Sequence, residues 1–225
     1  MMISECFSSL QGEGALAGCP SFFIRTTGCR LRCRWCDTPY TSWETEGRRI
    51  AVEDLLKMVR ESGMHHVVIT GGEPLLQREI GQLTTLLKDS VFHITMETAG
   101  TVAPDFDCDL LSLSLKTSNS DPEGRWAERH RKLRLDLEPA RRLLDRAPDF
   151  QLKFVVRGGE DIPEILEIVE KLGVGPSWKI QLMPEGRTAE DVAARAAEVA
   201  GLCREYGFRY TPRLHLSLFG GGRGV

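Results

Sequence analysis

Short apolar runs of strand length alternate with amphipathic runs of helix length along most of this chain. In residues 51–63, Leu55, Leu56 and Val59 recur at helical spacing and Gly63 provides a stop. The apolar run HVVIT that follows predicts a buried strand. By the same criteria, strands are predicted at 21–27, 66–70, 91–98, 109–116, 150–156 and 178–184, and helices at 51–63, 77–89, 162–173 and 188–207.

Strands that alternate with helices predict a parallel sheet joined by right-handed crossovers. The chain has 225 residues, which suits one sizeable domain, whereas a closed eightfold barrel typically takes about 250. We therefore expect an α/β fold with a partial, open TIM-like barrel of about six parallel strands and helices outside. Residues 1–225 are expected to form this single domain. A charge-rich excursion around residues 119–137 breaks the alternation.

Polar and glycine-rich segments follow the predicted strands. In sheets of this kind, the carboxyl ends of the strands carry the chemistry. We expect the segments to line one rim together: GCRLRCRWCDT at 28–38, TGGEP at 70–74, ETAG at 97–100, KTSN at 116–119 and MPEG at 183–186.

Composition limits the environment of the protein. With 41% hydrophobic residues, 27% charged residues and a net charge of −3, a soluble globular protein is expected, with no nucleic-acid partner. We expect no signal peptide and no membrane span, hence a cytoplasmic protein with reduced thiols. Clustered cysteines then indicate metal binding or catalysis rather than disulfides. The dispersed thiols are expected to be small buried hydrophobes: Cys6, Cys19, Cys108 and Cys203.

Three of the cysteines, Cys29, Cys33 and Cys36, stand in a C-x3-C-x2-C arrangement directly after a predicted strand. Structural zinc requires four ligands, and the spacing favours no fourth among the available histidines: His65, His66, His93 and His215. A four-iron cluster held by only three cysteines keeps one iron open to a small molecule. Structural zinc and a plain electron-transfer cluster remain as alternatives, both of which would make this a non-enzymatic metal module.

The cysteine spacing resembles the motif of the radical S-adenosylmethionine superfamily. The resemblance implies a 4Fe-4S cluster whose open iron is chelated by S-adenosylmethionine, and cleavage of that cofactor to a 5′-deoxyadenosyl radical. TGGEP is similar to the second motif of the superfamily, so Gly72 and Glu73 are expected at the cofactor. The remaining expected cofactor contacts are Trp35, Cys36, Asp37, Ser114, Leu115, Lys116, Gln181, Leu182, Met183 and Pro184.

Four segments together resemble the 7-carboxy-7-deazaguanine synthase family: FSSLQGEG at 7–14, GCRLRCRWCDT at 28–38, TGGEPLLQ at 70–77 and METAGT at 96–101. The resemblance implies a carbon–nitrogen lyase of queuosine and 7-deazapurine biosynthesis. Its reaction converts 6-carboxy-5,6,7,8-tetrahydropterin to 7-carboxy-7-deazaguanine with loss of ammonia. Where members often have Ser-Pro-Lys, this chain has Ser114, Leu115 and Lys116, a departure from the family pattern at that strand end.

The same resemblance assigns roles to further residues. Thr38 would ligate Mg²⁺, and Glu97 could reach the substrate as the one candidate catalytic side chain. The C-terminal tail would close over the substrate, with His215 or Arg223 near it. The other expected substrate contacts are Leu10, Gln11, Gly12, Arg25 and Thr70.

The implied partners are a pterin substrate, an electron donor such as flavodoxin or ferredoxin, and a second copy in a homodimer. A glycyl-radical enzyme activase is the nearest alternative function, because it shares the cysteine spacing and a short partial barrel but acts on another protein. LQGEG, upstream of the cysteines, and Thr38 argue against it.

Overall fold

A nine-stranded sheet organises the part of the chain that the computed structural model describes, residues 1–175 and 177–224. Its strand order is β3-β1-β2-β4-β5-β6-β7-β8-β9. The strands are β1 (Met2–Leu10), β2 (Pro20–Thr26), β3 (Arg48–Arg49), β4 (His66–Gly71), β5 (His93–Thr98), β6 (Leu110–Ser114), β7 (Phe150–Val156), β8 (Ile180–Pro184) and β9 (Arg209–Tyr210). The helices are α1 (Pro39–Ser42), α2 (Val52–Ser62), α3 (Ile80–Asp89), α4 (Ala127–Leu135), α5 (Glu138–Leu144), α6 (Ile162–Leu172), α7 (Ala189–Tyr206) and α8 (Leu214–Phe219).

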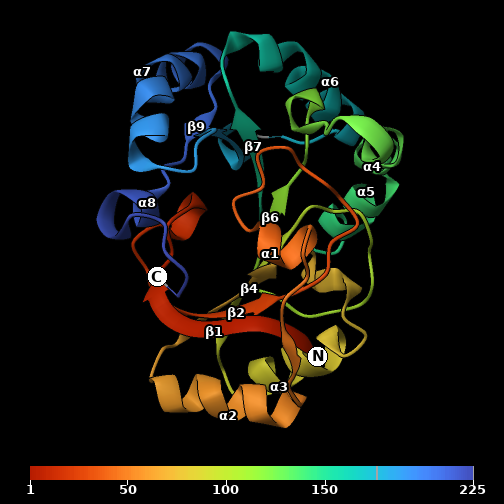
Figure 1. The fold of residues 1–225 in the computed structure, drawn as a ribbon, viewed down its shortest axis with the longest axis vertical. Helices are drawn as coiled ribbons and strands as arrows, with labels where there is room; N and C mark the ends of the chain where they lie inside the picture. Colours follow the sequence, from red (N-terminus) through yellow and green to blue (C-terminus); the bar gives the residue numbers. More distant parts are fainter. Residues whose placement is uncertain (176, 225) are drawn as a thin grey trace.

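The sheet is an open, mostly parallel half-barrel. Strands β2, β4, β5, β6, β7 and β8 pair in parallel, and β9 extends that series. Figure 1 shows the sheet curving round from β1 and β2 to β7, with α8 at the open side between β1 and α7. Helices α2 and α3 lie outside one end of the sheet, and α6 and α7 lie outside the other. The expected fold class, a partial barrel of about six parallel strands with outer helices, is confirmed.

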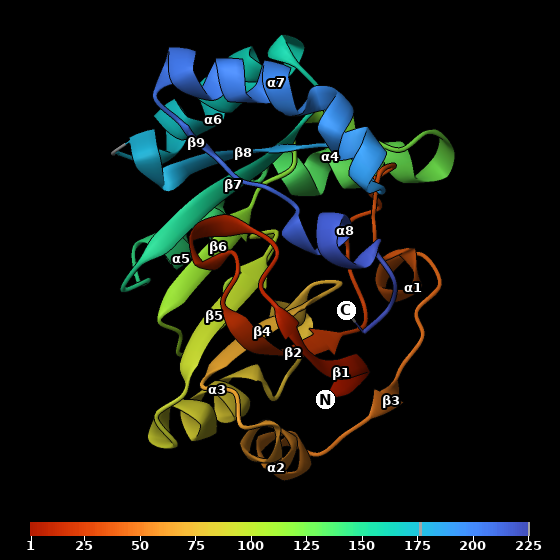
Figure 2. The same ribbon diagram turned by 90° about the vertical axis from the view of Figure 1, so that its left-hand side faces the viewer.

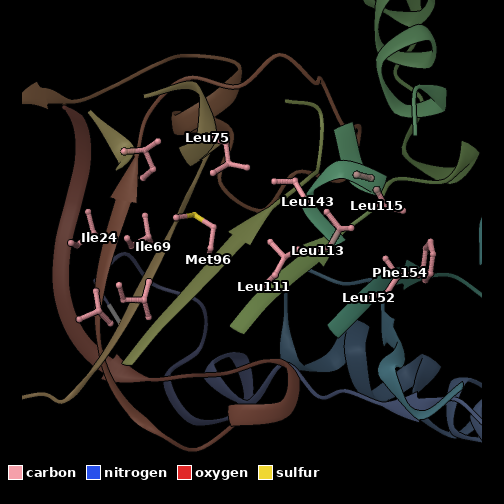
Figure 3. Close-up of a cluster of buried hydrophobic side chains, with 14 of the residues drawn as sticks. Ile24, Ile69, Leu75, Met96, Leu111, Leu113, Leu115, Leu143, Leu152 and Phe154 are labelled. Carbon is pink, nitrogen blue, oxygen red and sulfur yellow. The ribbon is translucent and has the colours of Figure 1, made fainter. Parts of the chain in front are cut away.

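Side chains along the strands point alternately to the two faces of the sheet, one toward the hydrophobic core and the other toward the concave interior. Ile69, Met96, Leu113 and Phe154 are fully buried in the hydrophobic layer between the strands and the outer helices (Figure 3). Successive side chains of a strand point to opposite faces. The neighbours of these apolar residues therefore face the concave interior. Each apolar residue has one polar neighbour that lines the cavity: Thr70, Glu97, Ser114 and Lys153, with the apolar Val155 beside them.

The N-terminal segment is the main feature that the alternation did not predict. Residues 2–10 form β1, which pairs antiparallel with β2, and the rings of Phe7 and Phe23 stack with centroids 5.0 Å apart across the pair. Figure 2 shows β1 and β2 side by side, with the turn after β1 reaching toward α8. An antiparallel strand beside a parallel sheet needs no crossover helix, so the strand–helix alternation does not reveal it.

The charge-rich excursion contains the helix α4, Ala127–Leu135. On its inner face the buried Arg134 donates to Asp121 at 2.6 Å and to Glu164 at 2.6 Å. The buried His130 accepts a hydrogen bond from the backbone N–H of Arg32, 3.0 Å away. The excursion therefore packs against the outside of the cysteine-bearing segment.

The dispersed cysteines differ in how deeply they are buried. Of the dispersed thiols, Cys203 is buried as expected, whereas Cys6, Cys19 and Cys108 are only half-buried. Within the described residues, no helix has the length and apolarity needed to cross a membrane.

Removing the Arg134 guanidinium should loosen the excursion. Arg134→Ala leaves two partly buried carboxylates without their partner, so we expect it to lower the free energy of unfolding by about 2 kcal/mol in urea titrations. Arg131→Ala is the matched control, because Arg131 bonds the same Asp121 at 3.3 Å from an exposed position. It should cost less than about 1 kcal/mol, and an equal loss in both variants would contradict the assignment.

Candidate active site

A cavity of about 280 Å³ opens at the carboxyl ends of the parallel strands. It receives residues from the end of β1, the cysteine-bearing segment 27–38, the ends of β4, β5 and β6, the middle of β7, and α8. The residues expected at the site that line it are Leu10, Gln11, Gly12, Arg25, Cys29, Cys33, Trp35, Cys36, Asp37, Thr38, Thr70, Gly72, Glu97, Ser114, Lys116, Met183, His215 and Arg223.

Close backbone contact holds the cysteine-bearing segment against the end of β4. Glu73 N–H donates to the carbonyl of Gly28 at 2.8 Å, and Gly28 N–H donates to the carbonyl of Thr41 at 2.8 Å. A Cβ on Gly72 would lie 2.4 Å from the Gly28 oxygen, nearer than any side chain can approach. The second glycine of TGGEP is therefore required by the packing of the two motifs on each other.

All three clustered cysteines border the cavity, with Cys33 buried and Cys29 and Cys36 half-buried. Burial raises the pKa of Cys29 and Cys33 to about 12, so as free thiols they are protonated at neutral pH. Cys36 Sγ lies 3.3 Å from the hydroxyl of Ser42. Ligation would remove the thiol protons, because metals bind cysteine as thiolate.

The donor set suits a cluster better than one ion. Across residues 1–175 and 177–224, no three histidine, cysteine, aspartate or glutamate side chains converge as the ligands of a single metal do. In an iron–sulfur cluster each thiolate binds a different iron, so the sulfurs stay apart. Three cysteines around one cavity fit this arrangement and argue against a structural zinc site.

Glu73 differs from expectation, because its carboxylate turns away from the cavity. It is fully buried and accepts hydrogen bonds from the Thr98 hydroxyl at 2.6 Å and the Ala99 N–H at 3.0 Å. Burial raises its pKa above the usual value despite these donors. In this conformation Glu73 braces the end of β4 against the end of β5, and the cavity is lined by Gly72 instead.

Glu97 gathers the residues expected to bind substrate. Its two carboxylate oxygens accept from Gln11 Nε2 at 3.0 Å and from the Thr70 hydroxyl at 2.8 Å. A Cβ on Gly12 would lie 2.1 Å from Nδ1 of His215, so the glycine lets α8 approach. These residues come from four separate segments and meet at one end of the cavity.

Arg25 enters the cavity from the end of β2. Its Nε lies 2.6 Å from Glu5 Oε1, and its guanidinium carbon lies 5.5 Å from the centre of the Phe7 ring. The Tyr40 hydroxyl also donates to Glu5, at 2.9 Å. Arg25 is thus held at the wall with part of its guanidinium available to an anion.

Thr38 lies at the start of the short helix α1, two residues beyond Cys36. Its hydroxyl is 3.3 Å from the Thr41 hydroxyl and 4.0 Å from Cys36 Sγ.

A charge cluster of buried Lys153 and Arg213, half-buried Glu13 and exposed Asp37 was not predicted from the sequence. Glu13 pairs with Lys153 and with Arg213, and Arg213 also pairs with Asp37. Burial alone would raise the pKa of Glu13, but the two cations lower it well below its ordinary value. The available signal was Lys153 itself, a single cation inside the apolar strand FQLKFVV.

Several expected cofactor contacts do not reach the cavity, because strand alternation or hydrogen bonding turns them elsewhere. Leu115 and Leu182 belong to the hydrophobic core, and Gln181 donates to Gln151 at 3.0 Å beneath the cavity floor. Pro184 also lies outside the lining. The structure thus places these four residues outside the lining of the cavity, and their contact with the cofactor stays a prediction. Lys116 does line the cavity, donating to the Ser114 hydroxyl at 2.7 Å.

Among the histidines considered as metal ligands, only His215 lines the cavity. His66 lies at the opposite, amino end of β4, where it bonds the hydroxyls of Ser21 at 2.6 Å and Thr95 at 2.8 Å. Burial lowers its pKa to about 4, which keeps the ring neutral within this hydrogen-bonded chain. His93 contacts the same ring, with the two ring centroids 4.9 Å apart.

Known proteins resemble this chain in sequence and in fold. The family model of the radical SAM superfamily matches residues 23–192. A 7-carboxy-7-deazaguanine synthase of Rhodopirellula baltica is 44% identical, covering 100% of this chain and 89% of the relative. A second, from Halobacterium salinarum, is 43% identical over 96% of this chain and 90% of its own length. The crystal structure of QueE from Escherichia coli superposes with a TM-score of 0.67 at 25% identity, covering 93% of this chain and 92% of QueE.

The half-barrel, the three-cysteine segment and these matches place the chain in the radical SAM superfamily. Within that superfamily it belongs to the 7-carboxy-7-deazaguanine synthase family. Family membership confirms the expected 4Fe-4S cluster and S-adenosylmethionine as cofactors. It also decides against a glycyl-radical enzyme activase and against a non-enzymatic metal module.

The charge cluster should make stability depend on pH through Glu13. Because the folded-state pKa is lowered, its ion pairs stabilise the fold above the ordinary pKa of 4.5 and are lost as pH falls below it. Glu13→Gln should lower the free energy of unfolding by about 3 kcal/mol at neutral pH. The difference from the unmodified protein should shrink in urea titrations at progressively lower pH.

The control for this prediction is Glu123→Gln, which changes the same chemical group at an exposed position. It should leave the free energy of unfolding nearly unchanged at every pH. A loss in Glu13→Gln that stayed constant down to the most acidic condition would show that the charge of Glu13 is not responsible.

Proposed function

We propose that this protein converts 6-carboxy-5,6,7,8-tetrahydropterin to 7-carboxy-7-deazaguanine and ammonia by a radical ring contraction. The observation that carries the proposal is the joint lining of one cavity by the three clustered cysteines and by the Gln11–Thr70–Glu97 group. The first is the expected cofactor end and the second the expected substrate end. Full-length similarity to 7-carboxy-7-deazaguanine synthases supports the same reaction.

At the cofactor end, Cys29, Cys33 and Cys36 would hold the cluster, leaving one iron for S-adenosylmethionine. When bound, this pair supplies the 5′-deoxyadenosyl radical that takes a hydrogen atom from the substrate. The chain contributes a pocket in which Trp35 and Gly72 border the cofactor side. Lys116 lies 5.7 Å from the centre of the Trp35 ring, which fixes one wall of this region.

At the substrate end, fixed polar groups match a flat pterin that carries a carboxylate. The Glu97 carboxylate accepts hydrogen bonds, as a pterin N–H edge requires, and Gln11 beside it offers both a donor and an acceptor. Arg25 supplies a guanidinium for the substrate carboxylate, a charge-assisted contact. Gly12 and His215 lie against each other at the same wall and limit the room for the ring.

Orientation is the main contribution of these groups. The substrate loses hydrogen from the carbon that bears its carboxylate, rearranges, regains a hydrogen atom and releases ammonia. Holding that carbon at one position relative to the radical source favours this route over others. The C-terminal residues Gly221, Gly222 and Arg223 border the cavity mouth, and closure by this tail would exclude water.

Four finer points belong to the same proposal. Thr38 would ligate Mg²⁺ together with substrate oxygens, as suits a hard cation that retains several waters. A flavodoxin or ferredoxin would supply the electron, and two copies would form a homodimer. The protein would act in the cytoplasm, where thiols stay reduced.

An anaerobic assay with the carboxypterin, S-adenosylmethionine and dithionite tests the reaction directly. The reconstituted protein should hold about four irons per chain and release 7-carboxy-7-deazaguanine. Cys33→Ala should lose most of the iron and all of the product. Cys108→Ala, which removes a half-buried thiol outside the cavity, should keep both. A brown, iron-loaded protein that releases no deazaguanine would refute the proposal.

The magnesium assignment makes a separate prediction. Thr38→Ala removes the oxygen ligand, so the Mg²⁺ concentration for half-maximal activity should rise about tenfold or more, as for the loss of a hydrogen bond to a charged group. Thr38→Ser keeps the hydroxyl and should restore most of the affinity. Unchanged Mg²⁺ dependence in Thr38→Ala, with iron content intact, would assign the ion to other ligands.

A further inference from the structure

Three arginines surround Trp126 beside the cysteine-bearing segment, two more flank one of them in the sequence, and the reaction at the cavity does not use them. Arg32, Arg125 and Arg129 place their guanidinium carbons 4.9, 5.1 and 5.8 Å from the centre of the Trp126 ring. Arg30 and Arg34, both exposed, flank Arg32 in the sequence. We call this group the arginine patch: Arg30, Arg32, Arg34, Arg125 and Arg129.

The charge of the patch is not neutralised within the protein. In the described portions of the chain, the salt bridges of arginine involve Arg25, Arg131, Arg134, Arg146, Arg157, Arg213 and Arg223, and no member of the patch. The exposed carboxylates beside the patch in sequence are Glu123 and Glu128. A local excess of positive charge therefore stands on a chain whose net charge is −3.

The patch is fixed to the cluster-binding segment. Arg32 Nη1 donates to the carbonyls of Cys29 and Leu31, each at 2.7 Å. From the excursion, Ser120 accepts the N–H of Arg34 at 3.1 Å, and Asn119 accepts from the indole N–H of Trp35 at 2.9 Å. The inner face of the excursion is thus used to hold the cysteines, while its outer face presents Arg125 and Arg129 to solvent.

The positive surface continues on the other side of the segment. A second hollow of about 300 Å³ is lined by Arg34, Arg187 and Arg195, together with Trp35, Arg157, Gly186 and the carboxylates Glu185 and Asp191. Arg187 Nη2 donates to the carbonyl of Arg34 at 3.1 Å, which joins the hollow to the arginine patch. Positive groups therefore border the segment on both sides.

We propose that the arginine patch is the docking surface for an acidic one-electron carrier protein. This inference rests on the proposed function, because only a cluster that must be reduced requires such a partner. In the step, the reduced carrier loses one electron and the cluster gains it, passing from the 2+ to the 1+ state, with no atom transferred. Complementary charge brings the carrier to the one segment that holds the cysteines.

Charge reversal on the patch tests the proposal without touching the cysteines or the cavity. Arg125→Glu combined with Arg129→Glu is made in the iron-loaded enzyme, and the probe is a reduced flavodoxin of strongly negative net charge. Its Kd, measured by anaerobic titration calorimetry at low salt, should rise about tenfold or more. Product formation driven by flavodoxin should fall in parallel, whereas formation driven by dithionite should stay unchanged.

The matched control reverses two exposed arginines at the opposite end of the molecule, Arg204 and Arg209. Arg204 lies in the last turn of α7, an 18-residue helix that runs about 27 Å away from the carboxyl rim. Arg204→Glu with Arg209→Glu should leave the Kd for flavodoxin unchanged. Arg125→Lys with Arg129→Lys keeps the charge and should bind nearly as the unmodified enzyme does.

The outcomes separate the two proposals. If Arg125→Glu with Arg129→Glu keeps the Kd and the salt dependence of the unmodified enzyme, the docking surface is refuted. The docking surface is also refuted if Arg204→Glu with Arg209→Glu raises the Kd for flavodoxin equally, since binding would then depend only on the total charge of the protein. If a transfer RNA binds the patch and does not compete with flavodoxin, the patch serves a nucleic acid instead. Absence of product with dithionite refutes the proposed reaction, while the Kd still decides the docking.

Discussion

The two-residue alternation of side chains in buried parallel strands is the constraint on which the rest of this structure depends. Along β4, β5, β6 and β7, one set of side chains builds the core against the outer helices, and the other set faces the concave interior. Shifting any strand by one residue would exchange the two sets. Register, core packing and cavity chemistry are therefore fixed together, and Glu97 and Lys153 cannot leave the cavity without exposing Met96 and Phe154 to it.

Ion pairs made by buried charged side chains hold the walls of the interior that the strand alternation lines with polar residues. Lys153 is fully enclosed, and burial of its ammonium is offset by Glu13, which raises its pKa above the ordinary value. Arg213 shares Glu13 and reaches Asp37, next to the cluster-binding cysteines. These ion pairs connect the turn after β1, the middle of β7, the start of α8 and the cysteine-bearing segment. The walls of the cavity are held by one set of ion pairs, so the cofactor end and the substrate end are positioned together.

Site residues could be predicted from the sequence where a short local motif identified them, and could not where their role depends on distant residues. Cys29, Cys33 and Cys36 were predicted because a short spacing on one segment carries the chemistry. Gln11, Thr70 and Glu97 were assigned from the resemblance of their segments to the 7-carboxy-7-deazaguanine synthase family. Glu73 was assigned to the cofactor, but its carboxylate satisfies donors of Thr98 and Ala99 that belong to another strand. The excursion at 119–137 was recognised only as charged, since its role depends on residues distant in sequence such as Glu164.

The sequence by itself determined the parallel half-barrel, the rim at which the chemistry lies and the three cysteines, because periodicity and short spacings are local properties. Packing between distant segments established that β1 adds an antiparallel strand beside β2, that Glu13, Lys153 and Arg213 share one site, and that Arg125 and Arg129 stand beside Arg32. Ion pairs and cation–ring contacts between distant segments form wherever folding brings the groups together. Their geometry therefore depends on the whole chain and leaves no pattern in any single segment.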